Sequence, residues 1–246
     1  MPGARIILDA VEAAILTIGN ELVSGDVANT NAPWLAKRLA ARGIEVVLTA
    51  SVPDELERIV DVVRREAALV DWLFVTGGLG GTPDDITREA LAATFDVPQV
   101  ELPELAAELR ERFVHDPEYA ARWARLPEGS RPLPNPLGGA PGFALGNVWV
   151  LPGLPSEMEA MFEAIADDLG GGAPIAVWRE RYRTGESRIV DLLQEAVERW
   201  PAVIVGSYPS FHAHGSEVEV VLKSRDAESV AAAAAWLEPE LRLRSG

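Results

Sequence analysis

The sequence predicts an α/β fold, in which a mostly parallel sheet is covered by helices on both faces and is followed by a small α+β domain. Short apolar runs, typical of buried parallel strands, alternate with segments whose apolar residues recur at helical spacing. A loop with four glycines follows the third run, and such sheets bind ligands at the carboxyl ends of their strands. Three glycines at 170–172 indicate a linker between a domain at 1–170 and a second at 174–246.

The first part of the chain predicts the order βαβαβ. Three apolar runs indicate strands, and the segments between them carry apolar residues on one helical face. Asn29, Thr30 or Asn31 can cap the first helix, and Gly43 ends it. The expected elements are strands at 14–19, 44–51 and 72–76, a helix carrying Leu35 and Leu39, and a helix carrying Leu56, Ile59, Val60 and Val63.

The middle of the chain is less regular. Five prolines between 127 and 141 indicate an extended, turn-rich segment. Residues 142–145 and 148–151 predict a hairpin across Gly146 and Asn147. Two further helices are expected, one carrying Leu102, Leu105, Leu109 and Phe113, and one carrying the core residues Met158, Met161, Phe162 and Ile165 behind an N-cap at Ser156.

Beyond the glycine linker, the tail predicts the order βαββα, which is typical of a small α+β domain. An alanine-rich helix is expected to begin at Asp226. The other expected elements are strands at 175–182, 203–208 and 218–222, and a helix carrying Ile189, Leu192, Leu193 and Val197.

Composition excludes several classes of function. The net charge of −16 argues against binding to nucleic acid or to an anionic membrane surface, because phosphates are neutralised by clustered Lys and Arg. No apolar run approaches the roughly 20 residues that span a bilayer. The chain has no cysteine, which excludes disulfides and thiolate metal sites and fits a cytoplasmic protein.

The glycine loop predicts a phosphate site. Glycines let backbone amides approach a ligand closely, and the helix that follows adds a partial positive charge. Two carboxylates, Asp84 and Asp85, then have the chemistry to hold a divalent cation on that phosphate. The spacing matches neither a P-loop nor the dinucleotide fingerprint. The alternative is a glycine-rich turn in which Asp84 or Asp85 caps the helix. The expected phosphate-binding residues are Gly77, Gly78, Leu79, Gly80 and Thr82.

Four segments together resemble the CinA-type competence/damage-inducible family, within the larger group of molybdopterin-binding domains. The tail from about 174 resembles the small KH-like domain that follows in CinA-type proteins, although it lacks the Gly-x-x-Gly loop of RNA-binding KH domains. The matching segments are GNELVSG at 19–25 with NTN at 29–31, TGGLG with DDIT within 76–87, LPNP to PGF within 133–143, and LPGLPSEM at 151–158.

The resemblance implies a three-layer α/β fold, a homo-oligomer, and a nucleotide or pterin bound at the strand ends. CinA-type domains are associated with metal-dependent hydrolysis of the pyrophosphate of ADP-ribose. Their molybdopterin-binding relatives adenylylate the pterin or insert molybdate. Asp85 matches the functional aspartate after the glycine loop of these relatives, and Asp54 matches their second acidic position.

These positions define a hypothesis for the site. Asp85, with Asp54 or Asp84, is expected to coordinate Mg²⁺, Mn²⁺ or Co²⁺. The carboxylate that stays off the metal, or Glu21, would orient a water molecule. Ser24, Asn29 and Asn31 are further candidates for substrate binding, and each can instead cap a helix. The second loop, at 151–158, adds the candidates Pro152, Gly153 and Glu157. Glu157 can instead favour the N-terminus of the following helix.

The leading functional hypothesis is a metal-dependent nucleotide pyrophosphohydrolase that acts on ADP-ribose or a related dinucleotide. The alternatives are a molybdopterin-binding protein that transfers an adenylyl group, and a non-catalytic nucleotide-sensing module.

Three features depart from the family pattern. Gly81 stands where proline is usual, which predicts a more mobile loop. Residues 119–123 (YAARW) stand where family members often carry a polar, basic stretch. The sequence also ends where many members continue into a nicotinamide-mononucleotide deamidase domain, so no deamidase activity is expected of these residues.

Overall fold

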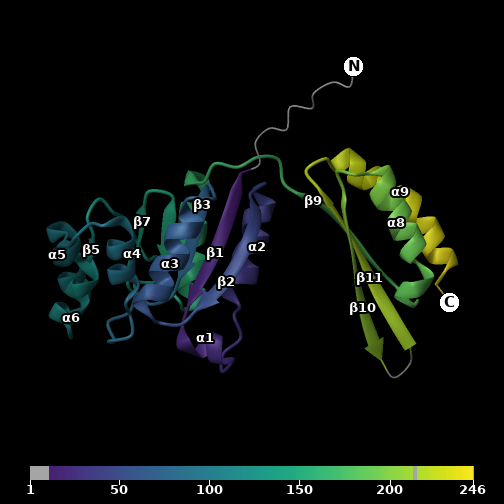
Figure 1. The fold of residues 1–246 in the computed structure, drawn as a ribbon. Coiled ribbons are helices and arrows are strands. Elements are labelled where there is room, and N and C mark those ends of the chain that lie inside the picture. Colours follow the sequence, from purple (N-terminus) through teal and green to yellow (C-terminus); the bar gives the residue numbers. More distant parts are fainter. Residues whose placement is uncertain (1–10, 213–214, 246) are drawn as a thin grey trace, which may run out of the picture. The chain divides into compact units, whose positions relative to one another are not determined.

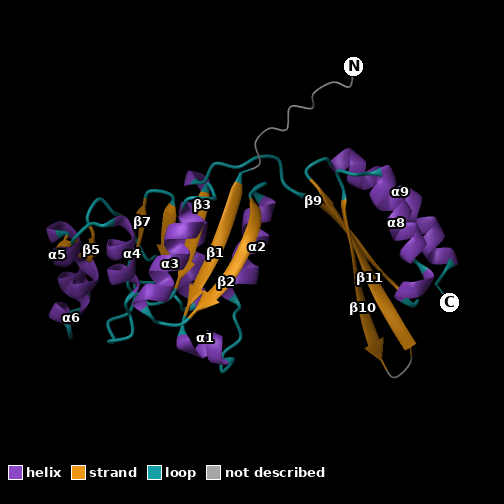
Figure 2. Ribbon diagram, in the orientation of Figure 1, coloured by secondary structure: helices purple, strands orange, loops and turns teal. Residues whose placement is uncertain are grey.

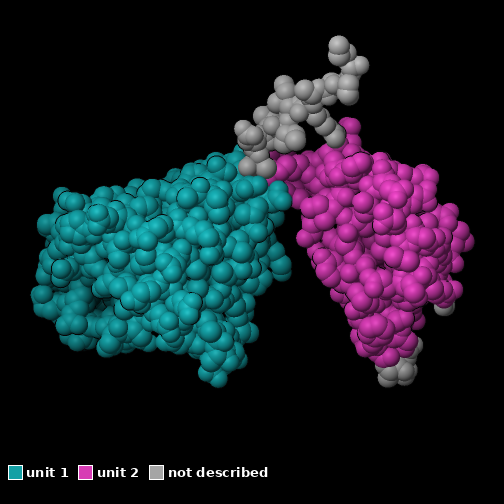
Figure 3. Space-filling view, viewed as in Figure 1, with its two compact units in different colours: residues 1–40, 44–172 teal, residues 41–43, 173–246 magenta. Residues whose placement is uncertain are grey.

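The computed structural model describes residues 11–212 and 215–245. The chain divides into two compact units (Figure 3), one formed by residues 1–40 and 44–172 and the other by 41–43 and 173–246. The division falls at the end of the glycine run 170–172. Among the described residues, no helix has the length and apolar character needed to cross a membrane.

The first unit is built on a six-stranded sheet (Figure 1). Its first three pairings are parallel and its last two are antiparallel, which confirms the mostly parallel sheet. In spatial order the strands are β2 (Glu45–Val52), β1 (Glu12–Ile18), β3 (Trp72–Thr76), β8 (Val148–Leu151), β7 (Gly142–Leu145) and β6 (Arg131–Leu133).

Helices cover both faces of this sheet (Figure 2), because successive side chains of each strand point to opposite faces. Ile15 packs in one apolar cluster and its neighbour Leu16 packs in the other. The first cluster includes residues of α2 (Asn31–Ala41) and α7 (Pro155–Ile165), and the second includes residues of α3 (Leu56–Ala67) and α4 (Thr87–Phe95). The three-layer arrangement is therefore confirmed.

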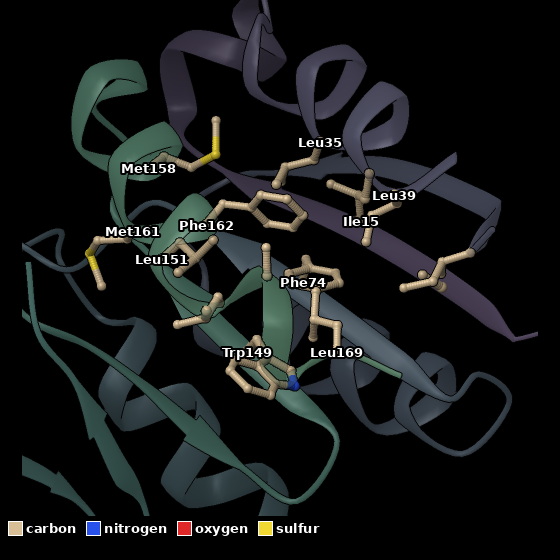
Figure 4. Packing of buried hydrophobic residues seen from close by; sticks show 14 of the residues in the cluster. Ile15, Leu35, Leu39, Phe74, Trp149, Leu151, Met158, Met161, Phe162 and Leu169 are labelled. Atoms are coloured by element: carbon tan, nitrogen blue, oxygen red, sulfur yellow. The ribbon is translucent and has the colours of Figure 1, made fainter. Parts of the chain in front are cut away.

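Phe162 lies at the centre of the first cluster (Figure 4), between Leu35 of α2 and Phe74 of β3. Its ring centroid lies 5.6 Å from that of Trp34 and 5.7 Å from that of Phe74. Met158 and Met161 are fully buried in the same cluster, which confirms their prediction as core residues.

Several short elements were not predicted, because each is too short to show a period in the sequence. Residues 103–112 form the expected helix α5, and β6 lies within the segment that was predicted as merely extended. The unpredicted elements are α1 (Asn20–Ser24), β4 (Gln99–Glu101), which pairs with β5 (Arg125–Pro127), α6 (Pro117–Ala121), and the 3₁₀ turns at 122–124, 166–168 and 186–188.

The predicted N-cap at Ser156 is wrong. Helix α7 begins at Pro155 and its N-cap is Leu154, which makes no side-chain capping bond. Proline at the first helical position has a fixed φ and no amide to satisfy, so it begins the helix one residue before the serine.

The second unit has the predicted order βαββα. Its antiparallel sheet packs against both helices through a cluster that contains Leu193, Val220 and Leu237. Asp226 caps the last helix as expected, since its carboxylate accepts from the amides of Glu228 and Ser229. The elements are β9 (Ala176–Tyr182), α8 (Val190–Arg199), β10 (Ile204–His212), β11 (Gly215–Ser224) and α9 (Ala227–Leu243), with the sheet order β10-β11-β9.

Candidate functional site

A pocket of about 230 Å³ lies at the carboxyl ends of the four parallel strands of the first unit. Ile18 ends β1, Thr76 ends β3, Asp54 follows β2, and Gly153 follows β8, and all four line the pocket. Parallel strands open such a crevice because their connections leave from the same edge of the sheet.

The pocket gathers part of the predicted site. The predicted residues that line it are Glu21, Asn29, Asn31, Asp54, Gly77, Gly78, Asp84, Asp85 and Gly153. The predicted residues that do not line it are Ser24, Leu79, Gly80, Thr82, Pro152 and Glu157.

The glycine loop turns sharply at the end of β3. Gly77 and Gly78 have φ values of 106° and 64°, a region that residues with a side chain rarely adopt. A Cβ on Gly77 would lie 2.2 Å from the carbonyl oxygen of Ile18. The loop therefore passes against the end of β1, and the predicted need for glycine is confirmed at these two positions.

Asp85 organises this loop from within. Its Oδ1 accepts from the Gly80 amide at 2.9 Å, and its Oδ2 accepts from the Thr82 amide at 2.8 Å and from the Thr82 hydroxyl. In this conformation Asp85 therefore occupies the Thr82 hydroxyl and the Gly80 amide, and their binding to a phosphate stays a prediction. The capping alternative is wrong, because the N-cap of α4 is Ile86, without a side-chain bond.

Two residues that the sequence analysis missed bind the loop from the first turn of α4. The buried hydroxyl of Thr87 donates to the Gly77 carbonyl at 2.8 Å. The buried guanidinium of Arg88 donates to the carbonyls of Leu79 and Gly80, at 2.5 Å and 3.2 Å. A hydroxyl at the start of a helix is a signal that sequence analysis could use, whereas nothing in the sequence distinguishes Arg88 from a solvated helix residue.

Asp54 and Asn20 bind each other across the pocket edge. The Asn20 amide donates to Asp54 Oδ2 at 2.9 Å, and the Asp54 amide donates to Asn20 Oδ1 at 3.3 Å. Partial burial raises the pKa of the Asp54 carboxyl, and the bond from Asn20 lowers it. The nearby negative charges of Glu21, Asp84 and Asp85 raise it further.

The raised pKa of Asp54 predicts that its charge destabilises the folded protein at neutral pH. A carboxyl whose pKa is raised by folding stabilises the fold while it is protonated, and this contribution is lost as pH rises through the folded pKa. Asp54→Asn should therefore raise the free energy of unfolding at pH 7, by less than about 1 kcal/mol because water screens the half-exposed site. Thermal unfolding measures the gain.

The same measurement at about pH 3, where an aspartate is largely protonated, is the control and should show no gain. The gain at pH 7 should also shrink in 1 M salt, at a Debye length of about 3 Å. A lower Tm for Asp54→Asn at pH 7 would contradict the prediction, and would mean that the bond from Asn20 outweighs the repulsion.

Asn29 and Asn31 fix the segment between α1 and α2. Asn29 Oδ1 accepts from the Ala32 amide at 3.1 Å, and its Nδ2 donates to Thr17 Oγ1 at 2.9 Å, so Asn29 takes the capping alternative. Asn31 Nδ2 donates to the Gly153 carbonyl at 2.9 Å and thereby ties α2 to the second loop. Its buried Oδ1 has no partner among the described residues.

The other predicted contacts lie away from the pocket. Glu157 Oε2 accepts from Asn135 Nδ2 at 2.9 Å, which places this carboxylate against the segment before β7 instead of in the site. The Ser24 hydroxyl donates to Asp26 Oδ2 at 2.7 Å, and Pro152 is buried after β8. These three residues do not line the pocket, so the structure does not bring them together with the rest of the predicted site.

Two departures from the family pattern touch each other. A Cβ on Gly81 would lie 2.5 Å from the ring carbon Cζ of Tyr119, so the tyrosine occupies the space of a side chain at position 81. The Tyr119 ring also packs edge-on against Trp123, with a centroid distance of 5.6 Å. A proline at position 81 therefore does not fit unless Tyr119 moves, which relates the glycine to the altered segment 119–123.

The pocket fits a hard cation only in combination with a ligand. No group of three or more Asp, Glu, His or Cys side chains within the described part of the chain is arranged to hold a metal. Mg²⁺ commonly takes one or two carboxylates and fills its other positions with water and substrate oxygens. Asp85 accepts loop donors through both of its oxygens, whereas Asp54 accepts, from the described residues, only the Asn20 amide, through Oδ2. A bond from the Thr82 side chain lowers the pKa of Asp84, so this exposed carboxylate is charged and available to a cation.

The three-layer sheet, the strand-end pocket and the glycine loop define an α/β protein with a small-molecule site at the carboxyl edge of its sheet. The chain belongs to the family of molybdopterin-binding domains. The family model described as "Probable molybdopterin binding domain" matches residues 14–170, and one described as "FAD synthase, middle domain" matches residues 181–245.

Relatives confirm the CinA-type resemblance. A CinA-like protein of Parasynechococcus marenigrum is 37% identical over 250 residues, which cover 94% of this chain and 58% of the relative. A protein of Archaeoglobus fulgidus is 36% identical over 223 residues, with 89% and 93% covered. The crystal structure of CinA from Thermoplasma acidophilum is 33% identical, with 65% of this chain and 98% of that chain covered and a TM-score of 0.61. The chain thus spans little more than half the length of the Parasynechococcus relative.

Proposed function

We propose that the strand-end pocket binds the phosphate of a pterin of the molybdopterin type, together with a divalent cation. One observation carries the proposal: a glycine loop and the carboxylates of Asp54 and Asp84 line the same pocket at the carboxyl edge of the sheet. Backbone amides suit a phosphate, and the carboxylates suit a cation bound to it. Membership of the molybdopterin-binding domain family supports the pterin as the ligand.

Charge in the pocket explains why a cation is needed. Glu21, Asp54, Asp84 and Asp85 line one cavity, so a phosphate that enters alone meets four carboxylates. Like charges in one cavity repel each other and also repel an anion that enters it. A divalent ion held by Asp54 and Asp84 would reverse this repulsion, and as a Lewis acid it would polarise the phosphate.

The residues of the site are suited to adenylyl transfer. In that reaction a phosphate oxygen of the pterin attacks the α-phosphorus of ATP, the bond to the β-phosphate breaks, and pyrophosphate leaves. Loop amides would stabilise the charge that develops on the phosphate oxygens. Asn31, which ties α2 to the loop after β8, would hold the two sides of the pocket at a fixed separation.

Hydrolysis of dinucleotides of the ADP-ribose type is the second candidate reaction, and the pKa of Asp54 supports it. Its raised pKa is the property of a carboxylate that can accept a proton from an attacking water molecule. Water would then attack one phosphorus, the bridging P–O bond would break, and ADP-ribose would yield AMP and ribose 5-phosphate. The two candidates share the pocket and differ in the nucleophile.

The experiment compares both reactions in one protein. With Mg²⁺, Mn²⁺ or Co²⁺ present, we expect saturable binding of molybdopterin and release of pyrophosphate from ATP. Asp54→Asn should lower turnover by about tenfold or more, because it removes a carboxylate that would hold the cation. Asp61→Asn, on the exposed face of α3, is the matched control and should leave turnover unchanged.

The possible results separate the candidates. Release of AMP from ADP-ribose without pterin, lost in Asp54→Asn, would favour the hydrolase. Binding without turnover of either substrate would favour a nucleotide-sensing module. Failure of the wild-type protein to bind molybdopterin or ADP-ribose with any of the three cations would refute the proposed site. A homo-oligomer stays a prediction, which sedimentation of the full chain tests.

A further inference from the structure

The first turn of α4 binds four successive carbonyls of the glycine loop. The hydroxyl of Thr87 donates to the Gly77 carbonyl at 2.8 Å, and its amide donates to the Gly78 carbonyl at 3.3 Å. The guanidinium of Arg88 donates to the next two, Leu79 at 2.5 Å and Gly80 at 3.2 Å. Two adjacent residues of one helix thus set the direction of four peptide groups.

Peptide geometry converts this contact into a direction for the loop amides. In a trans peptide the carbonyl and the following amide point in opposite directions. The amides of residues 78–81 therefore point away from α4. The Gly80 amide is bound by Asp85, whereas those of Gly78, Leu79 and Gly81 have no acceptor among the described residues. Such a set of outward amides is a site for an anion.

The charge of Arg88 supports the same conclusion. Only 6% of this residue is exposed, and no carboxylate of the described residues forms an ion pair with it. Its Nε is also buried without a hydrogen-bond partner. A buried cation without a carboxylate in direct contact costs free energy, which the nearby charges of Glu89 and Asp85 offset only in part, since the pKa of Arg88 is still lowered by burial. An anion bound on the other side of the loop would offset it further.

We propose that Arg88 is a positioning residue for the ligand phosphate: it holds the Leu79 and Gly80 carbonyls so that the loop presents a positive potential and its free amides, from Gly78 at the pocket wall to Leu79 and Gly81 beyond it, to the anion. The residue does not line the pocket, so it acts through the loop. The proposal rests on the proposed function in one respect, namely that the ligand carries a phosphate.

The binding test uses inorganic pyrophosphate with Mg²⁺ as the probe, measured by calorimetry on the full chain. Arg88→Met keeps the length of the side chain and removes both donors. It should weaken binding by about tenfold to a hundredfold, the value of one hydrogen bond to a charged donor. Arg88→Lys keeps the charge and one donor group, so it should recover about half of the loss on a logarithmic scale.

Two threonines of α4 give a matched pair in case Arg88→Met does not fold. Each hydroxyl donates to a backbone carbonyl at 2.8 Å, that of Thr87 to Gly77 in the loop and that of Thr94 to Ala90 in the helix. Thr87→Val should weaken pyrophosphate binding by about threefold or more, and Thr94→Val should not change it. Equal affinities in the two valine variants would overturn the proposal.

Amide NMR separates positioning from simple stabilisation. In the wild-type protein pyrophosphate should shift the amide resonances of Gly78, Leu79 and Gly81, and in folded Arg88→Met these shifts should be lost. A lower Tm with unchanged affinity and unchanged amide shifts would overturn the proposal.

The free protein tests the inference independently of the proposed function. If the wild-type chain binds no phosphorylated probe, the proposed function fails. The positioning role is then decided by hydrogen exchange of the Gly80 amide without ligand. Faster exchange in Arg88→Met supports the role of Arg88 in ordering the loop, and unchanged exchange overturns it.

Discussion

The Phe162→Ala variant is expected to lose about 3–5 kcal/mol in the free energy of unfolding of the first unit. Phe162 is fully buried, and its ring packs edge-on against Trp34 and tilted against Phe74. Removal of the ring leaves a cavity where α2 and α7 meet the sheet, and the surrounding strands hold their neighbours too firmly to fill it. A urea titration, followed by hydrogen exchange of peptides from residues 11–172, measures the loss in this unit.

Leu69→Ala is the control within the same unit. This leucine is 67% exposed, so its truncation should change the free energy of unfolding by no more than about 0.5 kcal/mol. A similar loss in both variants would mean that Phe162 contributes no more than a surface residue, and would contradict the central position of Phe162 in the core.

The Gly77→Ala variant is expected to affect both stability and ligand binding. The left-handed region costs a residue with a side chain about 1–2 kcal/mol. The new Cβ would lie 2.2 Å from the Ile18 carbonyl oxygen, so the loop or the end of β1 must move. Crowding of this kind adds about 1–3 kcal/mol. Because the moved loop no longer presents its amides to the pocket, the affinity for a phosphorylated ligand should fall by about a hundredfold, as for loss of two hydrogen bonds.

Gly25→Ala separates the two causes. Gly25 has a φ of 85°, but no heavy atom lies within 4 Å of the Cβ that alanine would add. This variant should therefore show only the conformational cost, about 1–2 kcal/mol, without loss of ligand affinity. Thermal unfolding and calorimetry compare the two variants. If they lost equal stability and equal affinity, the contact between Gly77 and Ile18 would have no special role.

The sequence alone predicted most of the architecture. Buried parallel strands need continuous apolar runs, and residues 14–19, 44–51 and 72–76 each show one. The structure has strands at all three places. The position of the glycine loop directly after the third strand also predicted the edge of the sheet at which the pocket lies. These properties are local, because they depend on neighbouring residues in the chain.

Tertiary structure decided which polar groups pair and which remain available to a ligand. Asp85 binds the loop amides, Glu157 binds Asn135, and Arg88 binds two loop carbonyls. The sequence names the donors and acceptors in each case but does not determine which of them pair.

Two hydrogen bonds at the pocket show why the sequence alone does not determine these pairings. The Asn20 amide binds Asp54 across 34 residues, and Asn31 binds the Gly153 carbonyl across 122. Such groups meet only after strands far apart in the sequence have paired in the sheet, since a hydrogen bond requires its atoms within about 3.2 Å. By itself, the sequence therefore determined the fold class and the edge of the sheet that carries the site. The assignment of each polar side chain to the ligand or to the fold depended on distances that only the folded chain defines.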